Sequence, residues 1–352
     1  MLQRSAFYCA CLLGLSLAAP AGDYRLSGPY NHDNLSIFLI HGANQPPAKT
    51  LLTLQEALDQ KKVVVFETGN VNQLAVENFS TDDVYIQSGD IVKGGQQDRV
   101  FPDDFLLPSK SGRVPIASFC VEQGRWTRRG AERADRFNAS TDAVAKKSLK
   151  LATRKKEGQA AVWQEVAMAR SQLAQAVEVS SEVSSASAGA ASGGGGGVGV
   201  ASASLASASP TSMQLALENR NVTKAASAYI GKLSGIIDGR PDIVGYAFAI
   251  NGKLNSADVY ATHDLFRRMW PKLLKASSIE AVAEKRDKTK SSPPDTLAIQ
   301  AALADAEHGR ESTKDIASRL KVIMRETEKG LLFETLDRDQ QGAWLHRSYV
   351  MK

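Results

Sequence analysis

The sequence predicts an α+β fold, with an antiparallel β-rich core that is sandwich-like or forms a partial barrel, a helical hairpin and C-terminal strands. Three observations predict it. Short apolar, β-branched segments separated by turn residues follow one another over residues 35–121. Apolar residues then recur at three- and four-residue spacing over 159–236, and strand patterns return after residue 243. Because strands and helices are segregated along the chain, the pattern favours α+β over a parallel βαβ arrangement.

Composition bounds the class of protein. The chain has 352 residues, of which 43% are hydrophobic and 23% charged, and it contains 3 Cys. These values exclude collagen-like, wholly disordered and disulfide-stapled proteins. We expect one core domain over residues 28–280, a loop over 281–295, and a C-terminal helix and strands over 296–352. The C-terminal strands either extend the same sheet or form a small appendage.

Residues 1–21 have the pattern of a secretory signal peptide. Arg4 precedes an apolar run from Ala6 to Ala18, and residues 19–21 supply the small side chains typical of a cleavage site. The run is shorter than the ~20 residues that span a bilayer. The sequence therefore predicts a periplasmic or secreted protein, cleaved near Ala21, with no transmembrane segment after cleavage. Cleavage leaves Cys120 as the single cysteine, which cannot form an internal disulfide.

The predicted core begins with strands and continues with two helices. Strand patterns lie at 35–40, 63–66, 71–79, 84–86 and 114–121, with a helical pattern at 51–58. An amphipathic helix is expected over 159–177 and a second over 215–236. Between them, 25 of the 30 residues from 180 to 209 are Ser, Ala or Gly, which predicts a flexible loop. Two helices joined in this way are expected to form an antiparallel hairpin.

The C-terminal third predicts sheet again. Strand patterns at 243–250 and 253–260 flank Asn251-Gly252, which is a strong short-range hairpin signal. A helix is expected after Thr262, which is a suitable N-cap residue. Three further strands are expected near 317–327, 331–337 and 343–351.

The positive charge is concentrated in one segment. The whole chain carries a net charge of +5, but residues 125–156 contain eleven Lys or Arg and three Asp or Glu. Such a segment either forms a solvated helical face or holds an anionic partner. Aromatic residues are not interleaved through it and no nucleic-acid-binding motif accompanies it, so nucleic acid is not an expected partner.

Two polar segments, 88–99 and 120–126, are the candidate ligand site. Both combine glycine with hydrogen-bonding and charged side chains, as loops at ligand sites often do. The glycines at 94 and 95 could let backbone N–H groups approach an anion. The alternative is a tight hairpin whose charges form structural salt bridges. The candidate ligand-binding residues are Asp90, Lys93, Gln97, Asp98, Arg99, Glu122, Gln123, Arg125 and Trp126.

The sequence signals for a catalytic site or a metal site are weaker. Cys120 precedes Arg125 by five residues, one short of the spacing in cysteine phosphatases, so a buried structural thiol is favoured over a nucleophile. Glu122 could form a carboxylate pair with Asp98 or Asp90, but a structural salt bridge from each of these residues to Arg99 or Arg125 is favoured. The five histidines lack metal-ligand spacing, so neither a metal nor a cofactor is expected.

Several longer motifs carry a family resemblance. The segment from Ser88 to Val100, the segment from Cys120 to Trp126, and the run 244–274 resemble the ADP-ribosylglycohydrolase- and rhodanese-phosphatase-associated protein domain, a family of unknown function. The resemblance covers roughly residues 30–280, with the Ser/Ala/Gly stretch as a variable loop. The family's name implies neighbours in ADP-ribose and phosphate chemistry.

Two functions follow as hypotheses. The first is a non-catalytic binding module that holds an anionic small molecule or a partner protein through the 88–99 and 120–126 segments. The second is an enzyme acting on a phosphorylated or ADP-ribose-like compound, with Glu122 or Asp98 as acid or base and Arg99 or Arg125 as anion clamp. The two segments are expected to lie side by side, with Arg99 or Arg125 within salt-bridge reach of Asp90, Asp98 or Glu122.

Overall fold

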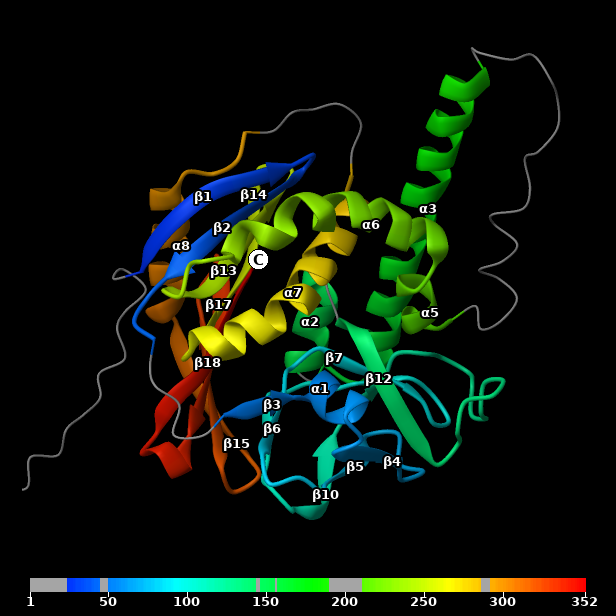
Figure 1. Ribbon diagram of the computed structural model, residues 1–352, viewed down its shortest axis with the longest axis vertical. Helices are drawn as coiled ribbons and strands as arrows, with labels where there is room; N and C mark the ends of the chain where they lie inside the picture. Colours follow the sequence, from blue (N-terminus) through cyan, green and yellow to red (C-terminus); the bar gives the residue numbers. More distant parts are fainter. Residues whose placement is uncertain (1–23, 45–49, 144–145, 156, 190–210, 286–291) are drawn as a thin grey trace, which may run out of the picture.

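Eight antiparallel strands form the larger of three sheets in a computed structural model of the chain (Figure 1). The structure describes residues 24–44, 50–143, 146–155, 157–189, 211–285 and 292–352, with the backbone alone for 179–189. In spatial order the strands are β1 (Arg25–His32), β2 (Leu35–His41), β13 (Ile243–Ile250), β14 (Lys253–Tyr260), β18 (Ala343–Met351), β17 (Gly330–Asp337), β16 (Leu320–Glu326) and β15 (Arg310–Ile316). The C-terminal strands therefore extend the sheet that the N-terminal strands begin.

The remaining strands form a second β-unit, which lies at the lower right in Figure 1, beside the lower part of the larger sheet. A seven-stranded sheet has the order β10-β5-β4-β12-β7-β8-β11, and a three-stranded sheet has the order β3-β6-β9. Only β3 and β6 pair in parallel among these described strands. Their bounds are β3 Leu51–Thr53, β4 Val63–Glu67, β5 Gln73–Asn78, β6 Asp83–Ile86, β7 Asp90–Gly94, β8 Arg99–Val100, β9 Phe105–Leu107, β10 Gly112–Ala117, β11 Phe119–Cys120 and β12 Arg136–Ala143.

Helices cover both faces of the larger sheet. The helices of the described residues are α1 (Leu54–Asp59), α2 (Lys147–Arg154), α3 (Gln159–Gly189), α5 (Met213–Leu217), α6 (Arg220–Leu233), α7 (His263–Ala283) and α8 (Thr296–Glu307), with short 3-10 turns at Ser234–Ile237 and Arg338–Gln340. Apolar residues of α8 pack on one face, and those of α6, α7 and the second β-unit pack on the other. The upper end of α3 extends beyond the body of the molecule (Figure 1). The predicted α+β class is confirmed.

Strand β2 explains why the larger sheet sits at the centre of the core. Leu35, Ile37 and Leu39 face the α7 side, while Phe38 and Ile40 face the α8 side. A strand with both faces covered has a continuous apolar sequence rather than an alternating one. The apolar run at 35–40 is therefore a central strand.

Four local expectations differ from the structure. The segment 180–189, expected to be loop, continues α3 to Gly189, because alanine and serine are compatible with a helix; residues 190–209 lie outside the described residues. The helical pattern at 51–58 begins with the strand β3, and Thr53 caps α1. The polar segment 88–99 contains strands β7 and β8 rather than a continuous loop. Strand β12 occupies part of the basic segment 125–156, which is thus not one helical face.

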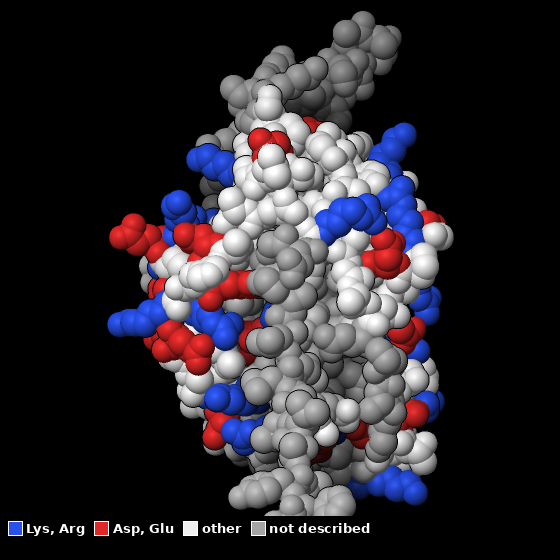
Figure 2. Space-filling model, turned by 90° about the vertical axis from the view of Figure 1, so that its left-hand side faces the viewer, with Lys and Arg blue, Asp and Glu red and all other residues white. Residues whose placement is uncertain are grey.

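The surface that carries α8 has mixed charge. Lysine and arginine side chains are interspersed with aspartate and glutamate on the face shown in Figure 2. Among the described residues on that face, neither sign forms a continuous patch. None of the described helices is both long enough and apolar enough to cross a membrane.

Candidate functional site

The two predicted polar segments lie side by side. Strand β8 pairs antiparallel with β11, which places Arg99 opposite Cys120. The Asp98 N–H donates to Glu122 Oε2 at 3.3 Å, and the Val121 N–H donates to the Asp98 carbonyl at 3.0 Å. The predicted adjacency of 88–99 and 120–126 is confirmed.

Two arginines neutralise two fully buried carboxylates at this junction. Arg125 Nη2 lies 2.6 Å from Glu122 Oε2, and Arg129 Nη1 lies 3.0 Å from Asp98 Oδ2. Asp98 also accepts hydrogen bonds from the Gly94 N–H and from Ser212 Oγ. Arg129, which the sequence analysis did not single out, contacts both carboxylates. An acid or base must exchange a proton with a substrate, and these carboxylates are already committed to hydrogen bonds.

Arg99 and Cys120 form the inner wall of the same junction. Arg99 is fully buried, and its Nη2 lies 3.4 Å from Glu67 Oε2. Its guanidinium also contacts the Cys120 sulfur. Burial raises the pKa of the Cys120 thiol to about 11, although Arg99 opposes the increase. The thiol is therefore protonated at neutral pH, which supports the structural interpretation over the nucleophile.

Other predicted site residues point elsewhere. Asp90 is buried and accepts a hydrogen bond from Lys272 Nζ at 2.8 Å, so of the two alternatives Asp98, and not Asp90, lies beside Glu122. Lys93 Nζ lies 2.5 Å from Glu218 Oε2 on the surface next to α5. Gln97 is buried beside Arg99, whereas Gln123 is exposed.

Trp126 is the exposed aromatic residue of the junction. Its side chain is 44% exposed, and the Arg99 guanidinium lies 5.6 Å from the centre of its ring. The preceding residue, Arg125, donates hydrogen bonds to the Gly94 and Gly95 carbonyls. The buried ion pairs therefore hold an exposed indole on a loop that is fixed to the second β-unit.

A second cluster of buried charge joins the two β-units. His346 on β18 has its Nδ1 2.8 Å from Asp104 Oδ2 and its Nε2 3.2 Å from Asp258 Oδ1. Burial alone would lower the pKa of His346, but the two carboxylates outweigh it and raise the pKa to about 9. The pKa of Asp104 is lowered, because attraction to His346 outweighs the effect of burial. At neutral pH the cluster is an imidazolium held between two carboxylates.

Aromatic and polar groups surround this imidazolium. The Tyr260 ring stacks on His346 with centroids 4.6 Å apart, and its hydroxyl donates to Gln87 Oε1 at 2.6 Å. Thr335 and the Ser88 N–H both donate to Asp104. The side chains of His346, Asp104 and Asp258 are all buried, so the cluster fits an internal support better than a site open to substrate.

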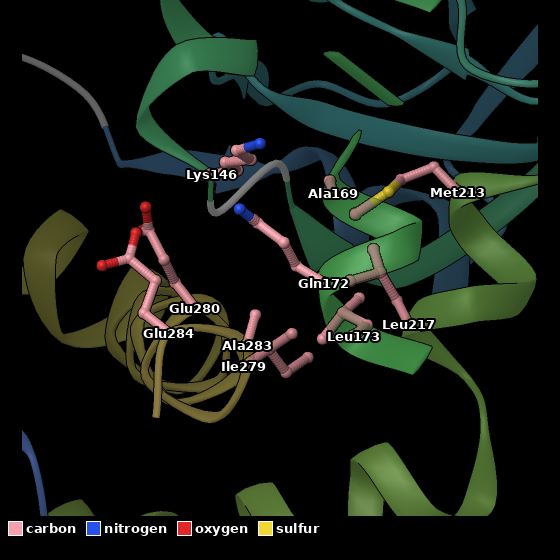
Figure 3. Close-up of a pocket in the computed structure, with 10 residues that line it drawn as sticks. All are labelled: Lys146, Ala169, Gln172, Leu173, Met213, Leu217, Ile279, Glu280, Ala283 and Glu284. Carbon is pink, nitrogen blue, oxygen red and sulfur yellow. The ribbon is translucent and has the colours of Figure 1, made fainter. Parts of the chain in front are cut away.

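A pocket lies between the helices α7, α3 and α5 (Figure 3). Glu280 of α7 and the C-cap residue Glu284 lie on one side, and Gln172 extends from α3. The residues that line the pocket are Lys146, Ala169, Gln172, Leu173, Met213, Leu217, Ile279, Glu280, Ala283 and Glu284. The sequence analysis did not identify this pocket.

The Glu280 carboxyl is buried in the wall of the pocket. Its Oε1 accepts hydrogen bonds from the Lys147 N–H at 2.9 Å and from Asn255 Nδ2 at 3.1 Å. Its Oε2 has no hydrogen-bond partner among the described residues. Burial raises the pKa of Glu280 to about 7; Lys150 opposes the increase and Glu284 adds to it.

Comparison with known families assigns the chain. The model described as the ARG and Rhodanese-Phosphatase-superfamily-associated Protein domain matches residues 23–350. The chain belongs to this family. The family match includes the C-terminal strands that lie beyond the resemblance seen at 30–280, in agreement with their place in the larger sheet. No curated protein and no solved structure matches the chain.

In this member of the family, the sequence analysis did not predict the cluster of buried charge, because its residues are distant in the sequence. Asp104, Asp258 and His346 are far apart in the sequence and meet only through the pairing of β14 with β18 and the docking of the second β-unit. One sequence signal was present. His346 and Ser348 place polar side chains at alternate positions of a strand in which Val350 faces the core.

Proposed function

We propose that this protein is a non-catalytic binding module that recognises an anionic group with the surface formed by Gln123, Trp126 and Arg128. The anionic group belongs to a small molecule or to a partner protein. The observation that carries the proposal is the exposure of Trp126 on a loop anchored by buried ion pairs. The proposed ligand class extends the family assignment, which by itself implies no activity.

An exposed tryptophan on a fixed loop suits binding for energetic reasons. Tryptophan is enriched among the residues that contribute most to interfaces, because it buries a large area. A loop that is ordered before binding loses little conformational entropy when the ligand arrives. Arg125 and Arg129 order this loop from within, so they support recognition without touching the ligand.

The charge of the loop favours an anion. Residues 122–136 contain five arginines and three acidic residues. Four of these arginines form salt bridges, whereas Arg128 is exposed and has no ion-pair partner among the described residues. A guanidinium in this position can bind a phosphate or a carboxylate with two hydrogen bonds.

The enzyme hypothesis receives less support from the same geometry. Its proposed acid or base, Glu122 or Asp98, is fully buried and bound by two arginines. Its proposed anion clamps, Arg99 and Arg125, already bind carboxylates of the protein. Catalysis at these residues would require breaking buried ion pairs.

A thermal-shift series tests the proposal. The probes are inorganic phosphate, ADP-ribose, a sugar phosphate and an acidic peptide, and a ligand at one hundred times its Kd adds about 2.7 kcal/mol of stability. We expect Trp126→Ala and Arg128→Ala to abolish the shift while leaving the Tm of the free protein almost unchanged. Phe79→Ala, which removes an exposed aromatic residue elsewhere, is the matched control and keeps the shift. An unchanged shift in both loop variants contradicts the proposal.

We also propose that the protein is exported, on the basis of the signal-peptide pattern at residues 1–21. These residues lie outside the described part of the chain. Expression of the full chain in a bacterial host, followed by mass spectrometry of the periplasmic and extracellular fractions, tests it. A mature N-terminus at Gly22 supports export, and an intact chain confined to the cytosol contradicts it.

A further inference from the structure

The pocket beside α7 combines an apolar wall with an unsatisfied carboxylate oxygen. Six apolar side chains form the wall: Ala169, Leu173, Met213, Leu217, Ile279 and Ala283. Glu280 is only 3% exposed, yet its Oε2 has no partner within the described residues. A buried polar atom without a partner costs free energy of the order of 1–3 kcal/mol. A ligand that donates a hydrogen bond to this oxygen would recover that cost.

The charges around Glu280 favour a cationic donor. Glu284, the C-cap residue of α7, follows Glu280 by four residues and also lines the pocket. Lys146 lines it as well, but its Nζ lies 3.7 Å from Glu165 Oε2 and is thus already paired. Lys150 of α2 acts on Glu280 from the next element, and Asn255 of β14 and Gln172 of α3 contribute neutral amides. An anionic ligand would meet two carboxylates here.

The size of the pocket limits the ligand. About 300 Å³ of empty space lies in and in front of the pocket, and most of it is open to solvent, so the enclosed part holds only a small group. The apolar wall suits an alkyl chain, while the carboxylates lie to one side (Figure 3). A ligand of a few heavy atoms with a charged amine at one end matches both features.

We propose that this pocket binds a short aliphatic amine, whose ammonium group donates to Glu280 Oε2 and whose alkyl chain packs against α3 and α5. The site is separate from the Trp126 surface and does not depend on the proposed function. An alkylammonium can be a free amine or the lysine side chain of a partner. The chemistry recognised is the same in both cases.

Protonation of Glu280 gives the site a pH dependence. Only the ionised carboxylate attracts an ammonium group, and the pKa of Glu280 in the empty pocket is about 7. Apparent affinity falls in proportion to the competent fraction of the protein. We therefore expect about tenfold tighter binding at about pH 8 than at about pH 6, with uptake of the ligand accompanied by proton release.

Calorimetric titration of the full chain with n-butylamine tests the proposal. We expect saturable binding of butylamine and no measurable binding of butyrate. Glu280→Gln keeps the shape and the acceptor for Lys147 and Asn255, and should weaken binding at least about tenfold. Ala283→Phe fills the pocket without changing its charge and should abolish binding. Asp264→Asn removes one charge from the first turn of the same helix and is the matched control.

The outcomes separate the possibilities. Nα-acetyl-lysine amide that binds as tightly as butylamine assigns the site to a lysine side chain, and weaker binding assigns it to a free amine. Equal binding of butyrate, or full binding by both Glu280→Gln and Ala283→Phe, overturns the proposal. Circular dichroism of each variant shows that it is folded, and Ala283→Phe keeps the test valid if Glu280→Gln does not fold.

Discussion

His346 Nδ1 lies 2.8 Å from Asp104 Oδ2, and this contact joins β18 of the larger sheet to the loop before β9 in the second β-unit. Both side chains are almost completely buried. Two residues 242 positions apart in the sequence are thus joined by an ion pair inside the core. Because buried charges are costly when unpaired, the two β-units are expected to separate only when the protein unfolds.

Replacement of His346 by Leu should strongly destabilise the fold. The change leaves the Asp104 and Asp258 carboxylates buried without their cation, which typically costs about 3–5 kcal/mol. Urea denaturation followed by circular dichroism measures the loss. The double variant His346→Leu with Asp104→Leu removes one of the stranded charges, so we expect it to recover part of the stability. A single variant as stable as the wild type would refute a structural role for the pair.

The same pair predicts how stability depends on pH. The pKa of His346 is raised from 6.5 to about 9 in the folded state, so its contribution is full below about pH 6.5 and is lost as pH rises through about 9. The pKa values of Asp104 and Asp258 are lowered, so their contribution is present above about pH 4 and is lost on acidification. Urea midpoints should decline above about pH 6.5, and this decline should be smaller in His346→Leu. An identical alkaline decline in both proteins would contradict the assignment.

Glu280→Gln should become more stable relative to the wild type as pH rises. The folded pKa of Glu280 is raised from 4.5 to about 7, so ionisation of the buried carboxyl penalises the fold increasingly between those values. The full penalty, roughly 3 kcal/mol, applies above about pH 7. We therefore expect the variant to gain stability relative to the wild type between about pH 5 and pH 8. A constant difference over that range, measured by urea denaturation, would show that Glu280 does not titrate there.

Arg125→Ala should destabilise the protein even in the absence of any ligand. It removes the 2.6 Å contact to Glu122 and the hydrogen bonds to the Gly94 and Gly95 carbonyls. We expect a loss of about 3 kcal/mol, because Arg129 continues to compensate Glu122 in part. Arg128→Ala is the matched control, since an exposed substitution usually changes stability by less than about 0.5 kcal/mol. Equal Tm values for the two variants would mean that the buried pair contributes little.

Gly95→Ala should lower the free energy of unfolding for two reasons, and a control variant separates them. Gly95 has a φ of +55°, and a Cβ there would lie 2.3 Å from the Phe137 ring. Gly130 has the same φ of +55° with no neighbour within 4 Å, so Gly130→Ala measures the backbone cost of about 1–2 kcal/mol. We expect Gly95→Ala to cost about 1–3 kcal/mol more because of overpacking. A difference near zero in the urea midpoints would indicate that Phe137 moves away freely.

Elements with a local cause could be predicted from the sequence. The hairpin at Asn251-Gly252 is one, because both residues adopt the positive φ that a two-residue turn requires. Thr262 accepts a hydrogen bond from the Leu265 N–H at the start of α7, as expected of an N-cap residue. The contact between Asp98 and Glu122 could also be predicted, because their segments lie at the ends of neighbouring strand patterns.

Elements with a distant cause could not be predicted. The sequence of β12, Arg136–Ala143, lacks an apolar alternation, and the segment is a strand because β4 and β7 pair with it. The pocket beside α7 is formed by three helices that meet only in the folded chain. Hydrophobic periodicity in the sequence predicts single helices and strands, so it detects neither the pairing of β12 nor the pocket.

The position of β2 sets a constraint on synthesis of the protein. β2 pairs with β13 through contacts such as His41 with Ile243, so its second neighbour leaves the ribosome about 200 residues later. At a translation rate of about 5–20 residues per second, this delay lasts roughly 10–40 s. During that interval a fully apolar strand has only β1 beside it and offers an open edge to other nascent chains. A holdase, or transport in an unfolded state, would protect the chain until its last strands arrive.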